Sequence, residues 1–161
     1  MTTRVLVAGI GNLFCGDDGF GPEVARRLAA SGALPEGVRA VDYGIRGMHL
    51  AYDLLDGYDA LVIVDAVPGD VPPGAVTVLE VGEDDLGATQ LDPHGMAPVA
   101  VLASLSDLGG RLPPTYVVGC RPLDVGERIG LSREVEAAVS VAMDAVHAVL
   151  RERVSAGREV G

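Results

Sequence analysis

The sequence predicts an α/β fold built on a mostly parallel, five-stranded sheet, and three observations support this prediction. Short β-branched runs alternate with segments of helical apolar periodicity, as they do in successive β-α-β units. One run, Ala60 to Val67, is apolar except for Asp65, as expected of a central strand buried on both faces. The first run leads into a glycine-rich turn and a helix start, which is typical of the first unit in such folds.

The first half of the chain contains the first three predicted strands and two predicted helices. Arg4 to Gly9 forms the first strand, and Pro22 suits position N1 of the helix that follows. That helix ends at Gly32, a residue type common just after helix ends. The second strand covers Val38 to Tyr43, and a short helix from about Gly47 to Leu55 leads from it to the central strand.

The second half continues with two strands and an intervening helix. After the turn Pro72-Pro73-Gly74, the alternating residues Ala75 to Val81 predict an edge strand. The polar residues Glu83 to Pro93 predict a surface loop, and a helix is expected from about Pro98 to Leu108. Thr115 to Cys120 then forms another buried strand.

A long C-terminal helix completes the predicted fold. Ser132 is its expected N-cap, and one face carries apolar residues at helical spacing, namely Val135, Val139, Met143, Val146 and Leu150. The tail from about Val154 has little to bury and is expected to fray. Without an internal repeat or a linker, residues 1–161 are expected to form a single domain.

Composition limits the classes of partner. The chain has 12 basic and 23 acidic residues, a formal charge of −11, which opposes nucleic acid and anionic membrane surfaces. The start of the chain lacks the apolar core of a signal peptide, and no apolar run approaches the roughly 18 residues of a membrane span. We therefore expect a cytoplasmic protein with Cys15 and Cys120 as reduced thiols. Because negative charge nearby disfavours the reactive thiolate, Cys15 is expected to pack rather than react.

The glycine-rich turn differs from a dinucleotide-binding fingerprint. Gly9 and Gly11 fit the first two positions of G-x-G-x-x-G, but Phe14 occupies the third. Asp17 and Asp18 follow, and two carboxylates at a helix N-terminus would repel a phosphate. The turn therefore predicts a crevice that suits a cation or a scissile peptide. Asp17 either assists Asp18 there or only begins the helix beside it.

Three polar residues are expected to meet at the carboxyl edge of the sheet. Asp65 ends a hydrophobic strand, where a carboxylate is costly unless it is paired, hydrogen-bonded or bound to a metal. The first strand ends at the same edge, so Asp18 is expected beside it, and His94 can reach this edge from its loop. Such a trio suits a divalent ion with open coordination positions or acid–base work on a peptide bond.

Position alone leaves structural alternatives open for these residues. Asp18 could cap the first helix, and Asp65 could cap the loop after its strand. His94 could be a solvated loop residue. Asp42, which ends the second strand two residues before Gly44, either lines the same crevice or stabilises its turn.

Several different short motifs are spread along the first two thirds of the chain. In order they are Gly9-Ile10-Gly11-Asn12-Leu13, Asp17-Asp18-Gly19-Phe20-Gly21, Asp42-Tyr43-Gly44 with Gly47-Met48, Val64-Asp65-Ala66 and Pro93-His94-Gly95. This ordered set resembles the hydrogenase maturation endopeptidases, which remove the C-terminal extension from the large subunit of nickel-iron hydrogenases.

The resemblance implies a three-layer α/β/α fold with helices on both faces of the sheet. It further implies an aspartic-type peptidase in which Asp18, Asp65 and His94 are the catalytic and metal-binding residues. Asp42 and Gly44 would position the substrate. The metal would be nickel already inserted in the large-subunit precursor, so the enzyme would have no permanently bound cofactor. Either a metal-bound hydroxide or a carboxylate base could then attack the peptide.

Two positions depart from the family pattern. The family often has glutamate where this chain has Asp18, which shortens the reach of the carboxylate by one methylene. Tyr43 replaces the middle glycine of an Asp-Gly-Gly motif, so a close backbone approach at that residue is not expected.

Two other functions fit parts of the same pattern. Asn12, His94 and Asp65 imitate the polar set of a peptidyl-tRNA hydrolase-like esterase, although the acidic charge opposes a tRNA substrate. A non-catalytic nucleotide- or metabolite-binding domain could use the same sheet, but the interrupted glycine pattern and the acidic turn disfavour it.

Overall fold

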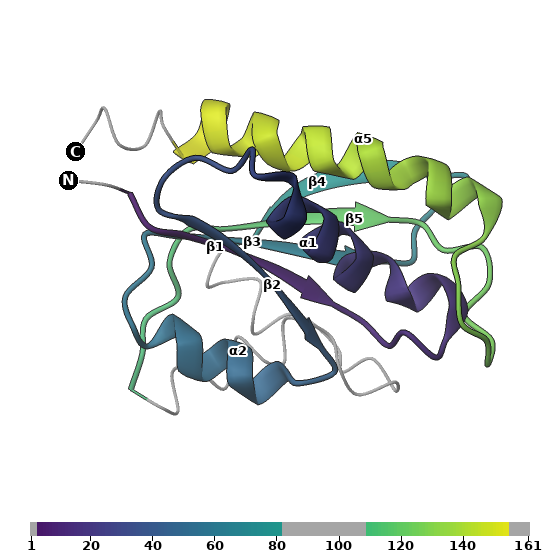
Figure 1. Ribbon diagram of the computed structural model, residues 1–161, viewed down its shortest axis with the longest axis horizontal. Coiled ribbons are helices and arrows are strands. Elements are labelled where there is room, and N and C mark those ends of the chain that lie inside the picture. Colours follow the sequence, from purple (N-terminus) through teal and green to yellow (C-terminus); the bar gives the residue numbers. More distant parts are fainter. Residues whose placement is uncertain (1–2, 82–108, 155–161) are drawn as a thin grey trace.

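The computed structural model describes residues 3–81 and 109–154. These residues form a five-stranded sheet in the order β2-β1-β3-β5-β4 (Figure 1). All neighbouring strands are parallel except β4, which runs antiparallel to β5 at one edge. The strands are Val5–Ile10 (β1), Val38–Gly44 (β2), Ala60–Ala66 (β3), Val76–Val81 (β4) and Thr115–Cys120 (β5). The predicted mostly parallel sheet is confirmed, with β3 at its centre and β4 as the expected edge strand.

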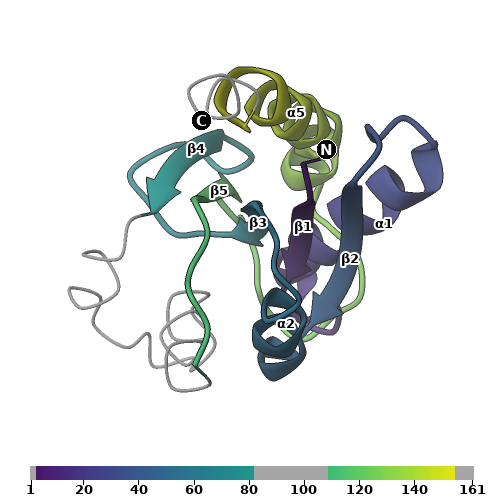
Figure 2. The same ribbon diagram turned by 90° about the vertical axis from the view of Figure 1, so that its left-hand side faces the viewer.

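Helices cover both faces of this sheet. Helices α1 (Phe20–Ser31) and α5 (Arg133–Val149) pack on one face, and α2 (Gly47–Leu54) packs on the other (Figure 2). Successive residues of a strand point to opposite faces, so Val5 and Val7 join the core under α1 and α5, whereas Leu6 and Ala8 join the core under α2. The three-layer α/β/α architecture is therefore confirmed.

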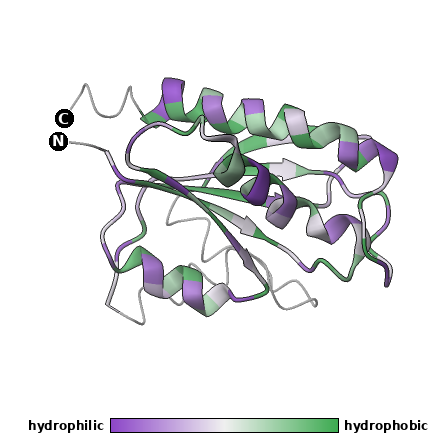
Figure 3. Cartoon of the chain, viewed as in Figure 1, coloured by the Kyte–Doolittle hydropathy of each residue, from purple (hydrophilic) through white to green (hydrophobic). Residues whose placement is uncertain are grey.

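The burial of the strands and helices follows their hydropathy. All six residues of β1 and of β5 are buried, as are the first six of β3. Hydrophilic and hydrophobic residues alternate along α5, as Figure 3 shows. Val135, Val139 and Val146 from the predicted apolar face pack in the core beneath this helix, as does Leu150 just after it. Leu79 of the edge strand β4 remains 56% exposed.

The helix ends agree with the sequence prediction at three places and differ at one. Ser132 is the N-cap of α5, and its hydroxyl accepts a hydrogen bond from the Val135 N–H at 3.4 Å. Gly32 ends α1 in the left-handed region at φ +68°, and α2 lies where expected. Pro22, however, is the third residue of α1 rather than N1, because a 3-10 turn, η1 (Gly16–Gly19), precedes the helix.

Some sequence predictions fall outside the described residues. These are the loop at 83–93, the helix at 98–108 and the tail beyond residue 154. The last described residues form a π-helical turn, η2 (Leu150–Val154). Within the described part of the chain, no helix combines the length and hydropathy needed to cross a membrane.

Candidate functional site

The strand order of the sheet reverses between β1 and β3. The chain leaves β1 through α1 on one face and reaches β3 through α2 on the other (Figures 1 and 2). In open α/β sheets, ligands bind where the strand order reverses in this way, at the carboxyl ends of the strands. Asp18 follows β1, and Asp65 lies near the end of β3. The structure thus places both predicted carboxylates at this reversal point.

Glycines bring the turn that carries Asp18 against the sheet. A Cβ atom on Gly21 would lie 2.2 Å from the carbonyl oxygen of Val64, and one on Gly9 would lie 2.3 Å from that of Gly21. At Gly11, where φ is +147°, a Cβ would lie 1.8 Å from the carbonyl oxygen of Asp18. Only glycine permits these approaches. As a result, α1 starts directly over β1 and β3, and η1 contacts β3.

The Asp18 carboxylate is oriented by the backbone before it. Its Oδ2 accepts a hydrogen bond from the Asn12 N–H at 2.8 Å, and the side chain is half-buried. Neither η1 nor α1 has a side-chain cap hydrogen bond at its N-terminus, so Asp18 does not serve as the helix cap that its position allowed. It instead follows β1 at the strand-order reversal, with one carboxylate oxygen held by a hydrogen bond.

Asp65 is a buried carboxylate at the same edge. It is 7% exposed, although the other buried residues of β3 are all apolar. Its backbone pairs in register with Gly119 of β5. The predicted burial of this side chain is therefore confirmed, and it lies on the strand next to the one that leads to Asp18.

Asp42 and Gly44 lie at the end of β2, which neighbours β1 on its other side. Asp42 is half-buried and pairs in register with Gly9. Gly44 adopts φ +55°, and its carbonyl accepts a hydrogen bond from the Gly11 N–H at 3.0 Å. The guanidinium of Arg46, a residue that the sequence analysis did not single out, donates to the Asp42 carbonyl at 2.9 Å. The turn is thus fixed at the same edge as the two other carboxylates.

Tyr43, between Asp42 and Gly44, has a structural role and points into the core. It is 2% exposed and packs in the core beneath α2. Its hydroxyl donates to Asp53 Oδ2 of α2 at 2.5 Å. Burial, followed by this hydrogen bond, raises the pKa of Tyr43 well above its usual range. The family's middle glycine is therefore replaced by a side chain that anchors α2, while the turn itself is made at Gly44.

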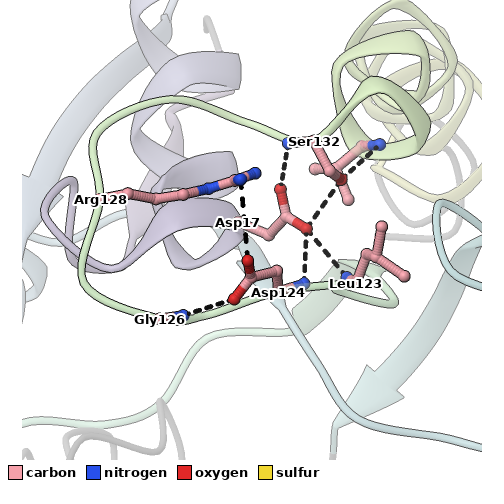
Figure 4. A network of polar contacts seen from close by, with 7 residues as sticks. Asp17, Leu123, Asp124, Gly126, Arg128 and Ser132 are labelled. Atoms are coloured by element: carbon pink, nitrogen blue, oxygen red, sulfur yellow. Dashed lines mark hydrogen bonds and ion pairs between the residues drawn. The ribbon is translucent and has the colours of Figure 1, made fainter.

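Asp17 is the residue whose role the sequence did not reveal. Its side chain is fully buried and accepts four hydrogen bonds from the chain between β5 and α5 (Figure 4). Oδ1 accepts from the Ser132 N–H at 2.6 Å. Oδ2 accepts from the Ser132 hydroxyl at 2.8 Å and from the N–H groups of Leu123 and Asp124 at 2.9 and 3.0 Å.

These contacts keep the Asp17 carboxylate charged. Burial alone would raise its pKa, but the hydrogen bonds from Ser132, Asp124 and Leu123 together lower it below the ordinary value. Asp17 therefore does not join Asp18 at the strand-order reversal, and it does more than begin a helix. It anchors the connection between β5 and α5 to the turn after β1, across 106 to 115 residues of sequence.

The cysteines are both free thiols in the structure. Cys15 is half-buried and forms an isolated parallel bridge with Arg128. Cys120 is fully buried, and burial, with a smaller contribution from the nearby Asp17 charge, raises its pKa to about 11. A reactive thiolate at Cys120 is thereby disfavoured.

The metal-binding trio stays a prediction. Across residues 3–81 and 109–154, no three histidine, cysteine, aspartate or glutamate side chains lie close enough together to hold a metal ion. The third predicted ligand, His94, lies outside the described residues. What the structure establishes is that Asp18, Asp65 and Asp42 follow or end three adjacent parallel strands at one edge.

The chain is similar to known proteins over most of its length. The family model of the hydrogenase maturation protease HycI matches residues 22–149. The hydrogenase 2 maturation protease of Escherichia coli is 32% identical over 151 residues, which cover 92% of each chain. The hydrogenase expression/formation protein HupD of Rhodobacter capsulatus is 34% identical over 134 residues, which cover 81% of this chain and 62% of that protein.

A solved structure agrees with these sequence matches. The hydrogenase maturating endopeptidase HybD of E. coli superposes with a TM-score of 0.78 at 31% identity, covering 93% of both chains. Sequence and fold thus agree over most of the chain, and the family model spans the strands that carry Asp42 and Asp65. This chain belongs to the hydrogenase maturation protease family.

Proposed function

We propose that this protein is the endopeptidase that removes the C-terminal extension from the nickel-loaded large-subunit precursor of a nickel-iron hydrogenase. The observation that carries the proposal is the placement of Asp18 and Asp65 on either side of the strand-order reversal, in a chain of the maturation protease family. Carboxylates at that position suit a cationic ligand.

In this proposal the nickel ion belongs to the substrate. Asp18, Asp65 and His94 supply additional ligands to an ion that the precursor already holds, and no cofactor resides permanently in the enzyme. Oxygen and imidazole ligands are both compatible with nickel. Shared coordination would bring the C-terminal segment of the precursor into the crevice, where Asp42 and Gly44 position it.

The cleavage itself is a hydrolysis. The oxygen of a water molecule bonds to the scissile carbonyl carbon, the C–N bond breaks, and a proton reaches the leaving amine. Asp18 and Asp65 are candidates to accept the proton from water, because each is a carboxylate at the proposed crevice. The ion would polarise the carbonyl or the attacking water. The enzyme is then an aspartic-type peptidase whose substrate recognition depends on metal.

One contact bears on the esterase alternative. The side-chain carbonyl oxygen of Asn12 accepts a hydrogen bond from the Phe14 N–H at 2.9 Å, so this amide stabilises the turn. A turn-stabilising amide is less suited to substrate binding, and the formal charge of −11 opposes a tRNA substrate.

Processing of two forms of one precursor tests the proposal. The purified protein is incubated with nickel-loaded precursor and with metal-free precursor, and the products are separated by gel electrophoresis. The loaded form is expected to shorten and the metal-free form to stay intact, because only the loaded form supplies the bridging ion. Equal shortening of both would contradict nickel recognition. Intact loaded precursor would contradict the peptidase function.

A further inference from the structure

Large apolar side chains are exposed on two segments next to Asp18. Phe14, in the turn after β1, is 68% exposed. On the connection between β5 and α5, Leu123, Val125 and Ile129 are 54%, 53% and 76% exposed. We call these four residues the apolar rim. Exposed apolar side chains that gather in one region commonly mark an interaction site, whereas scattered single ones do not.

The two segments are joined into one framework. The Arg128 N–H donates to the Phe14 carbonyl at 3.0 Å, and the Gly16 N–H donates to the Arg128 carbonyl at 2.8 Å. The Asp17 N–H donates to the Asp124 carbonyl at 2.8 Å, and the buried Asp17 carboxylate adds its four bonds (Figure 4). The rim residues are therefore carried by a fixed backbone, which lowers the entropic cost of binding a partner.

The segment that carries three of the four rim residues has no net charge. The connection at 121–132 contains two arginines, one aspartate and one glutamate, so it is neutral in a chain of formal charge −11. Asp124 and Arg128 also approach within 3.7 Å of each other, with both side chains about half exposed. Exposed apolar residues on a neutral segment of an acidic protein suit an apolar protein surface better than a nucleic acid or an anionic membrane.

We propose that the apolar rim is a docking surface for the folded body of the large-subunit precursor. This inference rests on the proposed function, because it uses the position of the rim beside the proposed processing site. Phe14 is four residues from Asp18, and η1 holds both segments at the same edge of the sheet. A precursor whose C-terminal segment enters at Asp18 would therefore lie beside the rim. Its apolar residues would bury Phe14, Val125 and Ile129, while the segment itself reaches the carboxylates.

Steady-state kinetics on nickel-loaded precursor tests this docking surface. The double variant Val125→Ser/Ile129→Ser is expected to raise KM at least about tenfold and to leave kcat within about twofold, since loss of uniform binding affects KM alone. Val141→Ser is the matched control, because Val141 is also 53% exposed but lies on the outer face of α5. Phe14→Ser, on the other segment, is expected to raise KM in the same way.

The outcomes separate the docking surface from the proposed function. Processing by the wild type and by Val141→Ser reports on the function, and the change in KM relative to them reports on the rim. Unchanged KM in both the Phe14 variant and the double variant would overturn the docking surface while the function stands. A second copy of this chain could also cover the rim, and sedimentation at the assay concentration tests this. If the wild type is a dimer and the double variant a monomer, the rim is a dimer interface and the proposal is overturned.

Discussion

At the scale of single residues, two neighbouring aspartates have different roles. Asp17 is fully buried and accepts four hydrogen bonds, whereas Asp18 is half-buried and has one carboxylate oxygen held by the Asn12 N–H. A 3-10 turn has about three residues per turn, so adjacent side chains leave it in different directions. The sequence shows only two adjacent carboxylates. Their separation depends on Ser132, whose place beside Asp17 no local pattern encodes.

Replacing Asp17 by asparagine is expected to destabilise the fold. An amide nitrogen cannot accept the hydrogen bonds that one carboxylate oxygen now receives, so the free energy of unfolding should fall by about 3 kcal/mol at pH 7. Urea denaturation measures this change. Asp70→Asn, at an exposed position, serves as the control and should leave the midpoint unchanged.

The stability difference between the wild type and Asp17→Asn is expected to depend on pH. The pKa of Asp17 is lower in the folded protein, so its contribution is complete above the unfolded pKa of about 3.9 and is lost as pH falls through the folded value. The difference between wild type and Asp17→Asn should therefore be largest at neutral pH and should shrink below about pH 4. A difference that stays constant through this range would refute the assigned role.

Tyr43 offers a test of a purely structural residue. Tyr43→Phe keeps the ring in the core but removes the donor to Asp53, which should lower the free energy of unfolding by about 1 kcal/mol. Because the turn is made at Gly44, kcat/KM for precursor processing should stay close to the wild-type value. Thermal unfolding and a processing assay measure the two quantities. A large loss of activity with unchanged stability would place Tyr43 in the site instead.

At the scale of elements, the close approach of α1 to β1 and β3 positions the site. The sequence predicted the strands and most helix ends because hydrophobic period, proline and glycine are local signals. It placed Pro22 at N1 rather than at the third helical position, since proline fits anywhere in the first turn, where the N–H groups lack helical partners. The hydrogen bonds between Asp17 and the β5–α5 connection join residues far apart in the sequence, so no local sequence pattern predicts them.

The close packing of α1 against β1 and β3 can be tested at Gly21. A Cβ there would lie 2.2 Å from the Val64 carbonyl and 2.4 Å from the Ile10 carbonyl, so Gly21→Ala must displace α1 and should cost at least about 3 kcal/mol of unfolding free energy. Gly69→Ala is the control, because its nearest neighbour outside the adjacent residues would be a methyl group of Val71 at 3.9 Å. Equal denaturation midpoints for the two variants would show that α1 does not pack as described.

At the scale of the whole molecule, parallel topology explains why much of the candidate site could be predicted. The carboxyl ends of parallel strands meet at one edge, so the ends of β1, β2 and β3 bring Asp18, Asp42 and Asp65 there whatever the details of packing. The anchor at Asp17 and the apolar rim depend on which loops touch, and the sequence pattern does not specify such contacts. His94, outside the described residues, stays a prediction.

The most direct test of the central claim is the rate at which nickel-loaded precursor loses its C-terminal peptide, followed by intact-mass spectrometry. Asp18→Asn and Asp65→Asn keep the shape of each side chain but remove a charged ligand and base, so the rate should fall at least about 100-fold. Asp70→Asn should cleave at the wild-type rate, and thermal unfolding should show all three variants folded. Wild-type rates in folded Asp18→Asn and Asp65→Asn would contradict the assignment of this edge as the processing site.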